Sequence, residues 1–495
     1  MIPALPAAEP RLQRRYSQLL VSSLTPAQSV AAGIHGLPGV SSAFAAAQAA
    51  WRFYSNERLE LSQLAQPLID YARQQVPSAC EQYVLVALDW CNLHYGHHAS
   101  KRARVELAQT KDLGYELLTA LAIGDHAGEP LAPLSLDLRA ADGVHSTRVQ
   151  PGRACGAPLD NIAGVMKHAT RLNLGRPLVF IIDREADSVL HLRQWDRRRF
   201  LFVVRANDAP RVDFRGACQS LGAVADQLKR EGKFRGCGPV LYKGREAQCH
   251  VAETSVVLRR PARQHRVRNG RKVHRNIKGK ALTLRLVVSE VRDAQGTVLA
   301  RWLLLTNLPA AVPAEAVAEY YHFRWRIESY HKLLKGAGQH LESWQQETPE
   351  AMARRLAVSA MAAVVVWRLA REQDPSAAEF REVLVQLSGR QMKRGRWGRP
   401  FTEPALMAGL MVLLPMLCLL EQRSPEALRA MVEKILPLAA LGRRAADASG
   451  RRATPARPEA AATPRHATEP FGGSVPRHHP VTSGALAERL DLPPP

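Results

Sequence analysis

The sequence lacks the patterns that mark several common protein classes. Its seven cysteines are scattered, and no Cys-x-x-Cys pair occurs. An odd number of unpatterned cysteines argues against a disulfide framework and favours reduced thiols in a cytosolic protein. We find no Gly-x-x-x-x-Gly-Lys phosphate loop and no internal repeat. The chain therefore offers no sign of a disulfide-rich, P-loop or repeat protein.

Long apolar runs and acidic residues are also scarce. The start, MIPALPAAEPRLQRR, has its basic residues after the apolar ones, so we expect no signal peptide. The longest apolar run, 405–420, contains Gly409 and Pro415 and is shorter than the roughly 20 residues of a membrane span. It predicts a buried helix pair or an interface.

The balance of charge is strongly basic. Lys and Arg number 68 against 45 Asp and Glu, which gives a formal net charge of +23. Such an excess favours a polyanionic partner, nucleic acid first and an anionic membrane second. Ten of the basic residues lie within 259–280, which contains no acid and is expected to form a basic hairpin loop. That loop either holds a DNA backbone or is merely solvated.

The 495 residues are enough for two to four domains, and the pattern of apolar residues changes along them. Residues 10–76 are predicted to be helical. Three strands follow from residue 83, and then a helix, a strand, a helix and a strand, which together indicate a mixed sheet with helices on its faces. Residues 210–306 are expected to be mostly strands, and 350–440 helical. Residues 441–495 are predicted to be disordered, because large apolar residues are few.

One predicted helix, 321–335, carries an unusual polar stripe. At about 100° per residue, Tyr321, Arg324, Glu328 and Lys335 fall within an arc of roughly 60°. A carboxylate between an Arg and a Lys suits a metal ligand flanked by phosphate-binding groups. The same stripe also fits an ordinary amphipathic helix in which Glu328 pairs with a neighbouring base.

Two aspartates are predicted at strand ends in the sheet. Asp89 ends YVLVALD, and Asp183 ends LVFIID and opens Asp-Arg-Glu-Ala-Asp. Asp183 could instead be a helix N-cap. With Glu328, the two aspartates can converge at one edge of the sheet. Three carboxylates without Cys or His suit Mg²⁺ or Mn²⁺, and two such ions would promote phosphoryl transfer while Arg324 and Lys335 hold DNA phosphates.

The spacing of Tyr321, Arg324, Glu328 and Lys335 resembles the Tyr-Arg-Glu-Lys signature of the DDE transposases of the bacterial insertion-sequence-four family. Residues 183–187 resemble the second acid motif of that family, and Asp89 stands where its first acid belongs. The resemblance covers roughly residues 10–440. One departure is Trp90, where relatives often have Thr.

The resemblance implies an α/β fold with an RNase H-like mixed-sheet catalytic core, a β-rich insertion, and flanking N-terminal and C-terminal helical domains. The implied domains follow one another along the chain: 1–76, which binds transposon ends; 77–345, the catalytic domain with its insertion at about 210–306; 346–440, for dimerisation; and 441–495, the tail.

The resemblance also implies cut-and-paste transposition of DNA. One strand is hydrolysed at each transposon end, the freed 3′-hydroxyl forms a hairpin that is reopened, and the end then joins target DNA. Two Mg²⁺ or Mn²⁺ ions would be held by Asp89, Asp183 and Glu328. The implied DNA contacts are Tyr321, Arg324, Lys335, Arg184, Arg205 and Trp302. For Trp302 the alternatives are a receptor for a flipped base and a tryptophan of the sheet core.

The partners implied are double-stranded DNA, as terminal inverted repeats and as target, and a second subunit in a homodimer. A bacterial cytoplasmic protein that associates with the nucleoid is expected, without a membrane partner. Two other functions stay open. One is a catalytically decayed DNA-binding inhibitor of transposition, and the other is a plain metal-dependent nuclease.

Overall fold

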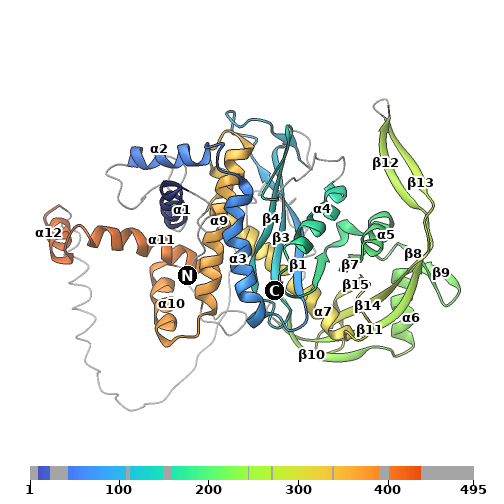
Figure 1. The fold of residues 1–495 in the computed structure, drawn as a ribbon. Coiled ribbons are helices and arrows are strands. Elements are labelled where there is room, and N and C mark those ends of the chain that lie inside the picture. The colour runs from blue at the N-terminus through green and yellow to red at the C-terminus, as the bar shows by residue number, and fades with distance from the viewer. Residues whose placement is uncertain are drawn as a thin grey trace, which may run out of the picture. The chain divides into compact units, whose positions relative to one another are not determined.

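A computed structural model of the protein describes residues 9–22, 43–107, 112–148, 158–242, 245–268, 271–336, 339–389 and 401–435. The predicted disordered tail lies outside these ranges. The chain divides into two compact units at Pro415; the large sheet and the helices up to residue 387 belong to the first, and the helix at 425–435 belongs to the second. It is a mixed α/β structure built on a large sheet (Figure 1).

Thirteen strands form the main sheet in the order β5-β4-β3-β1-β6-β7-β15-β14-β11-β8-β9, with β2 paired to β3 and β10 to β11. β1 is parallel to β6, and β6 is parallel to β7. β3 pairs antiparallel with β1 on one side and with β4 on the other. The strands are β1 (Val84–His94), β2 (Val105–Glu106), β3 (Leu113–Gly124), β4 (Pro130–Ala140), β5 (Gly143–Ser146), β6 (Leu178–Ile182), β7 (Leu201–Ala206), β8 (Arg211–Phe214), β9 (Ala217–Ser220), β10 (Arg235–Tyr242), β11 (Arg245–Leu258), β14 (Leu282–Arg292) and β15 (Val298–Thr306).

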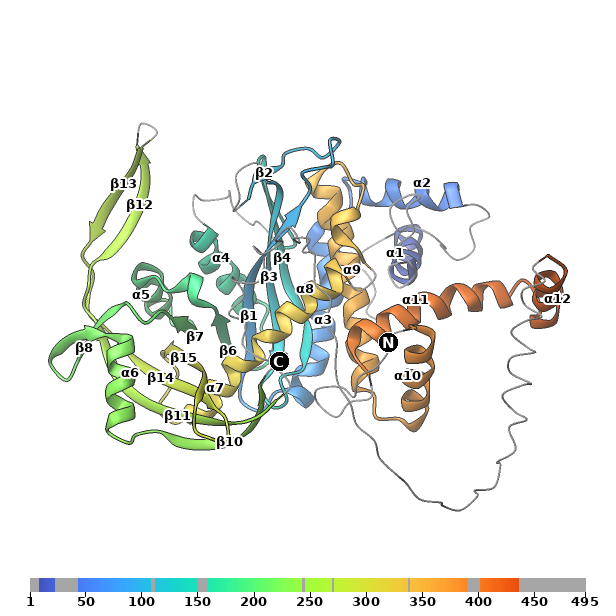
Figure 2. The same ribbon diagram turned by 180° about the vertical axis from the view of Figure 1, so that it is seen from behind.

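Helices cover the sheet, and α3, α9 and β4 pack against one another (Figure 2). The helices are α1 (Pro10–Ser22), α2 (Ala43–Tyr54), α3 (Leu61–Ala79), α4 (Pro158–Arg171), η1 (Arg184–Ala186), α5 (Val189–Arg197), α6 (Leu221–Arg230), α7 (Ala314–Phe323), α8 (Trp325–Lys335), η2 (Leu341–Ser343), α9 (Pro349–Arg371), α10 (Pro375–Leu387), α11 (Glu403–Leu420) and α12 (Pro425–Ile435). Among the described residues, α11 alone is long and apolar enough to cross a membrane, a test that buried core helices also pass.

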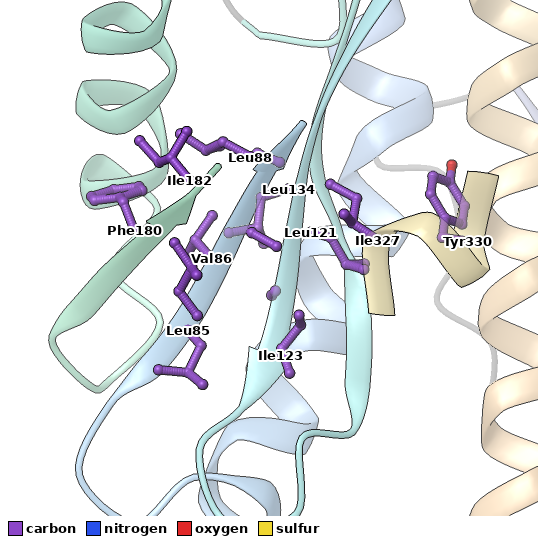
Figure 3. Close-up of a cluster of buried hydrophobic side chains, with 14 of the residues drawn as sticks. Leu85, Val86, Leu88, Leu121, Ile123, Leu134, Phe180, Ile182, Ile327 and Tyr330 are labelled. Carbon is purple, nitrogen blue, oxygen red and sulfur yellow. The ribbon is translucent and has the colours of Figure 1, made fainter. Parts of the chain in front are cut away.

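Part of the core of the sheet is formed by apolar side chains from β1, β3, β4 and β6 (Figure 3). Leu85, Leu121 and Phe180 are almost fully buried, as are Ile327 and Tyr330 of α8. Burying such side chains contributes about 1.5–3 kcal/mol each relative to exposure. This packing fixes α8 on β1 and β3, and so fixes the helix that carries Glu328.

Residues 210–306 are mostly strands, as expected, and they also contain a helix, α6, which Ser220 caps by accepting from the Ala223 amide at 3.2 Å. Two other details were wrong. Residues 405–420 lie within one helix, α11, which continues through Pro415, so the helix pair is wrong, while the interface, the other alternative for this run, stays a prediction. β1 does not end at Asp89 but continues to His94, because β3 pairs with it along its whole length.

The signature segment is two helices rather than one. α7 ends at Phe323 and α8 begins at Trp325. Around the break the backbone hydrogen bonds span fewer residues. The Arg324 amide donates to the Tyr321 carbonyl and the Ile327 amide to the Arg324 carbonyl, both at 3.1 Å. These bonds span three residues, as in a 3₁₀ turn, rather than the four of an α-helix.

The turn between β3 and β4 supports this break. Gly128 has φ +63°, and a Cβ added there would lie 2.1 Å from Cδ1 of Phe323. Its carbonyl accepts from Nε of Arg326 at 2.7 Å. The turn therefore contacts the chain on both sides of Arg324, and only glycine fits that approach.

A buried histidine holds α8 on the sheet. His331 faces the Thr119 hydroxyl of β3 at 3.4 Å, and burial, with Lys335 and Arg324 nearby, lowers its pKa to about 3. Since the unfolded histidine takes up a proton first, its contribution to stability falls as pH drops from about 6.5 towards 3.

We expect His331→Gln to remove this dependence. Between pH 4.5 and 6.5, the free energy of unfolding of the wild type should change relative to the variant by up to about 1.4 kcal/mol per pH unit. Urea unfolding at several pH values measures it. A constant difference between the two proteins would contradict the assignment.

Candidate active site

The register of two parallel strands brings the two aspartates together. Leu88 of β1 pairs with Ile182, the last residue of β6; Asp89 is the next residue of β1, and Asp183 directly follows β6. Neighbouring strands lie about 4.8 Å apart, and residues in parallel register share a face. Asp89 therefore lies where the parallel pairing of β1 ends, although β1 itself continues.

Asp183 follows β6 directly and caps the short helix η1. One of its carboxylate oxygens, Oδ1, accepts from the Glu185 amide at 2.9 Å. The N-cap role that the sequence left open is thus present in this structure. One carboxylate oxygen remains outside that bond, so the cap does not exclude a second role as a ligand.

Glu328 reaches the same region from α8, which packs on β1 and β3. Its carboxylate accepts from Nη2 of Arg324 at 2.8 Å, and Nη1 of Arg324 lies 3.4 Å from the carboxylate of Asp89. The Arg324 side chain is 6 % exposed. One buried guanidinium thus bridges the first and third acids of the predicted set.

The electrostatics show how closely the groups interact. Burial raises the pKa of Asp89 to about 7; Arg324 lowers it, whereas Asp183 and Glu328 raise it further. Burial also raises the pKa of Glu328 against the effect of Arg324. Burial opposes the charge of Arg324, but Asp89, Tyr321, Asp183 and Glu328 outweigh it and raise its pKa. All three acids are therefore within electrostatic reach of one cation.

The three carboxylates suit a hard cation, but their side chains do not form a metal-binding cluster. Within the described ranges, no three His, Cys, Asp or Glu side chains are close enough to hold a metal ion. Arg324 instead supplies the positive charge between Asp89 and Glu328. Carboxylate oxygens alone are ligands that Mg²⁺ and Mn²⁺ accept. The chemistry of the residues fits such an ion, provided that Arg324 gives way.

Tyr321 and Arg205 lie on the β7 side of the acids. Tyr321 is 2 % exposed. Burial raises its pKa, while Arg324 and Arg205 lower it. Both predicted DNA contacts are therefore near Arg324, but the tyrosine is covered in this structure.

Lys335 and Arg184 differ in their surroundings. Lys335 donates to the Asn92 carbonyl and pairs with Glu342 at 3.0 Å, so it links α8 to β1. Arg184 is exposed on η1, beside Asp183. The structure brings Arg184, Arg205, Arg324 and Tyr321 towards the acids and ties Lys335 to the backbone of β1.

Trp302 lies on β15 and is 7 % exposed. It lines a pocket of about 520 Å³ together with residues of α7, including Glu319 and Phe323. Phe323 is the residue before Arg324, so the pocket adjoins the break in the signature segment. Both interpretations of Trp302, as core and as receptor for a base, agree with this placement.

Asp187 is a residue that sequence reasoning did not single out. Its side chain is 4 % exposed, and its carboxylate accepts from the Asn207 amide at 3.1 Å. This bond ties the segment after Asp183 to the end of β7. The signal in the sequence was its position at the end of Asp-Arg-Glu-Ala-Asp, four residues after Asp183. At that spacing the side chain faces the end of β7.

Comparison with known proteins finds one matching family model. Residues 161–365 match the family model described as the transposase DDE domain. The match includes Asp183 and Glu328 and begins after Asp89. It supports a DDE transposase and, with that, an enzyme that acts on DNA.

A solved structure is also similar: the cryo-EM structure of a piggyBac transposase synaptic complex with hairpin DNA. The identity is 10 %, the TM-score is 0.27, and the match covers 72 % of this chain and 57 % of that one. The match thus spans little more than half of that chain, and likeness at this level does not inform the fold or the mechanism.

Replacing Arg324 tests the role of the buried cation. We expect Arg324→Met to lower the free energy of unfolding without divalent ions by on the order of 3–5 kcal/mol, because two buried carboxylates lose their partner. The loss should be smaller at pH 6 than at pH 8, since Asp89 has a pKa of about 7 and can protonate. Arg230→Met, at an exposed position of α6, is the control for chemical denaturation. Equal effects of the two variants would contradict this role.

Proposed function

We propose that the protein is a metal-dependent DDE transposase that cuts and joins DNA by phosphoryl transfer. The observation that carries the proposal is the convergence of Asp89, Asp183 and Glu328 on one buried arginine. The transposase DDE domain match over 161–365 supports it independently. The particular family with the Tyr-Arg-Glu-Lys signature is part of the proposal, on the spacing of Tyr321, Arg324, Glu328 and Lys335.

The strand order supports an RNase H-like core in this proposal. β4, β3, β1, β6 and β7 follow one another in the sheet, with β1, β6 and β7 parallel. Strands β8 to β15 would then form the insertion between β7 and the helix that carries Glu328. In this arrangement the helix after the insertion places Glu328, the third acid, near the point where the parallel pairing of β1 and β6 ends.

Asp89, Asp183 and Glu328 would hold two divalent ions, Mg²⁺ or Mn²⁺. Bound ions supply charge neutralisation for the attacking and leaving oxygens of a phosphodiester. Arg324 would move from the carboxylates to a DNA phosphate. Its positive charge would then pair with the acids before DNA binds and with the phosphate afterwards. Arg184 and Arg205 would orient the backbone beside it, and Lys335 would do so after leaving Glu342.

The partners belong to the proposal as well. Terminal inverted repeats and target DNA are the substrates, with the N-terminal helices within 1–76 as the end-binding domain. A homodimer through the C-terminal helices would hold two ends together. Its support is the set of exposed apolar residues on α11, which are Val412, Met416, Leu417, Leu419 and Leu420. Patches of that kind commonly mark interfaces. A bacterial cytoplasmic location is proposed with these substrates.

Removing either well-placed acid tests the reaction. We expect Asp183→Asn and Glu328→Gln each to lower Mg²⁺-dependent cleavage of transposon ends about 1,000-fold, since metal-based charge stabilisation contributes several kcal/mol. DNA binding should remain. Asp112→Asn, which changes a side-chain contact with His94, is the matched control.

Three outcomes would count against the proposal. Unchanged cleavage in both acid variants would overturn the site. Sequence-specific binding by the wild type without cleavage, in Mg²⁺ and in Mn²⁺, would identify a decayed inhibitor. Cleavage without joining of a pre-cut end to a target plasmid would identify a plain nuclease.

Trp302 can be tested separately from the acids. Trp302→Phe keeps an aromatic face, whereas Trp302→Leu fills the core but cannot stack on a base. Because stacking contributes about 1–3 kcal/mol per base, hairpin formation should fall roughly 5- to 150-fold only in the leucine variant. A 2-aminopurine placed at the DNA end reports the unstacked base. Equal fluorescence with both variants would assign Trp302 to the core.

A further inference from the structure

A two-stranded hairpin stands apart from the main sheet. β12 (Ala262–Arg268) and β13 (Arg271–Ile277) pair only with each other, in register from Ala262↔Ile277 to Arg268↔Arg271. Figures 1 and 2 both show it extending away from the thirteen-stranded sheet. At about 3.3 Å per residue, each strand is roughly 23 Å long. We call this element the arm.

The composition of the arm is unfavourable for an isolated hairpin. Six basic residues and no acid occur in its strands: Arg263, Arg266, Arg268, Arg271, Lys272 and Arg275. A two-stranded hairpin alone is marginally stable in water, and like charges on adjacent strands repel. A polyanion lying along the arm would remove that repulsion. Charge and shape therefore both point to an extended anionic partner.

The dimensions fit one kind of site on DNA. The major groove of B-DNA is about 12 Å wide and admits a two-stranded β-ribbon. At 3.4 Å per base pair along the axis, an arm of roughly 23 Å spans about seven base pairs. Lys278 and Lys280 continue the positive charge beyond β13, and Arg259 and Arg260 precede β12.

The root of the arm is attached to the catalytic edge. Arg193 of α5 donates to the carbonyls of Leu258 and Arg260 at 3.1 and 3.0 Å. Arg260 lies 3.9 Å from the carboxylate of Asp187, four residues after Asp183. A pocket of about 660 Å³ at this junction is lined by Asp187, Arg260 and Ala262, among others.

The position of the arm is therefore coupled to the segment that carries the second acid. Asp187 also accepts from the Asn207 amide after β7, so the same carboxyl joins η1 and β7 and contacts the root of the arm. DNA held along the arm would be placed at a defined distance from Asp183. We propose that the arm binds in the major groove of the duplex being cut, several base pairs from the scissile phosphate. This inference rests on the proposed function for the identity of the DNA.

The test compares two sets of three neutralised charges in the full chain. Arg266→Gln, Arg268→Gln and Arg271→Gln together remove half of the arm's charge. Arg230→Gln, Lys233→Gln and Arg245→Gln remove the same charge from exposed positions on α6, after α6 and on β11. Binding of a transposon-end duplex is measured against salt concentration without divalent ions, so catalysis plays no part.

If the arm contacts phosphates, the arm variant should bind with a salt dependence shallower by about 2.7 units of slope, whereas the control keeps the wild-type slope. Methylation of guanine N7 by dimethyl sulfate, which occurs in the major groove, should be blocked by the wild type over about seven base pairs and not by the arm variant. Equal slopes for the arm variant and the control, or protection that survives in the arm variant, would overturn the proposal.

A second variant guards against an effect of altered folding. Residues 264–275 are replaced by Asn-Gly, which favours a tight hairpin turn. This shortened arm should lose the same N7 protection while its thermal unfolding midpoint stays that of the wild type. Protection retained without the arm would overturn the proposal. The binding result stands apart from end cleavage, so loss of groove protection and failure of the transposase assignment are separate findings.

Discussion

Three carboxylates can share a partly buried edge of a sheet only if positive charge lies among them. In this protein the charge is Arg324, which bridges Asp89 and Glu328 while its side chain is almost fully covered. The cost of burying one guanidinium is offset by several acids, and the acids depend on it in turn. The parallel pairing of β1 with β6 supplies two of those acids, and α8 supplies the third. The sheet places the two aspartates, and the break between α7 and α8 places Arg324, so that one cation lies among the acids.

Arg324 occupies the carboxylates that the proposed mechanism gives to metal. Its guanidinium pairs with Asp89 and Glu328, two of the three proposed ligands. A divalent ion and Arg324 would compete for the same oxygens. In the proposed mechanism this competition couples metal binding to release of the arginine towards a phosphate. One residue then senses both the ion and the DNA.

Much of the site could be predicted because its signals are local. The strand before Asp183 and the spacing of Tyr321, Arg324, Glu328 and Lys335 are visible in short stretches of sequence. The strand and helix order of the mixed sheet also followed from periodicity. Helix α6 could have been found too, since Leu221, Val224, Ala225 and Leu228 are buried at helical spacing.

The missed features depend on distant partners. β1 continues past Asp89 only because β3 pairs along its full length, which residues 83–89 cannot show. The break at Arg324 is not marked by a glycine or a proline in the sequence. It is accompanied instead by the ion pairs of Arg324 and by a turn nearly 200 residues upstream. The link from Asp187 to the arm joins segments that are far apart in the chain.

That upstream turn has a consequence for how such a protein loses function. Gly128 touches neither DNA nor metal in the proposed mechanism, yet its missing side chain leaves room for Phe323, and its carbonyl holds Arg326. A larger side chain at this buried glycine would overlap the ring of Phe323, directly before Arg324, while every signature residue stayed intact. Inspection of the motifs alone would classify such a variant as active. A substitution that inactivates the protein can therefore lie outside the residues proposed to be catalytic.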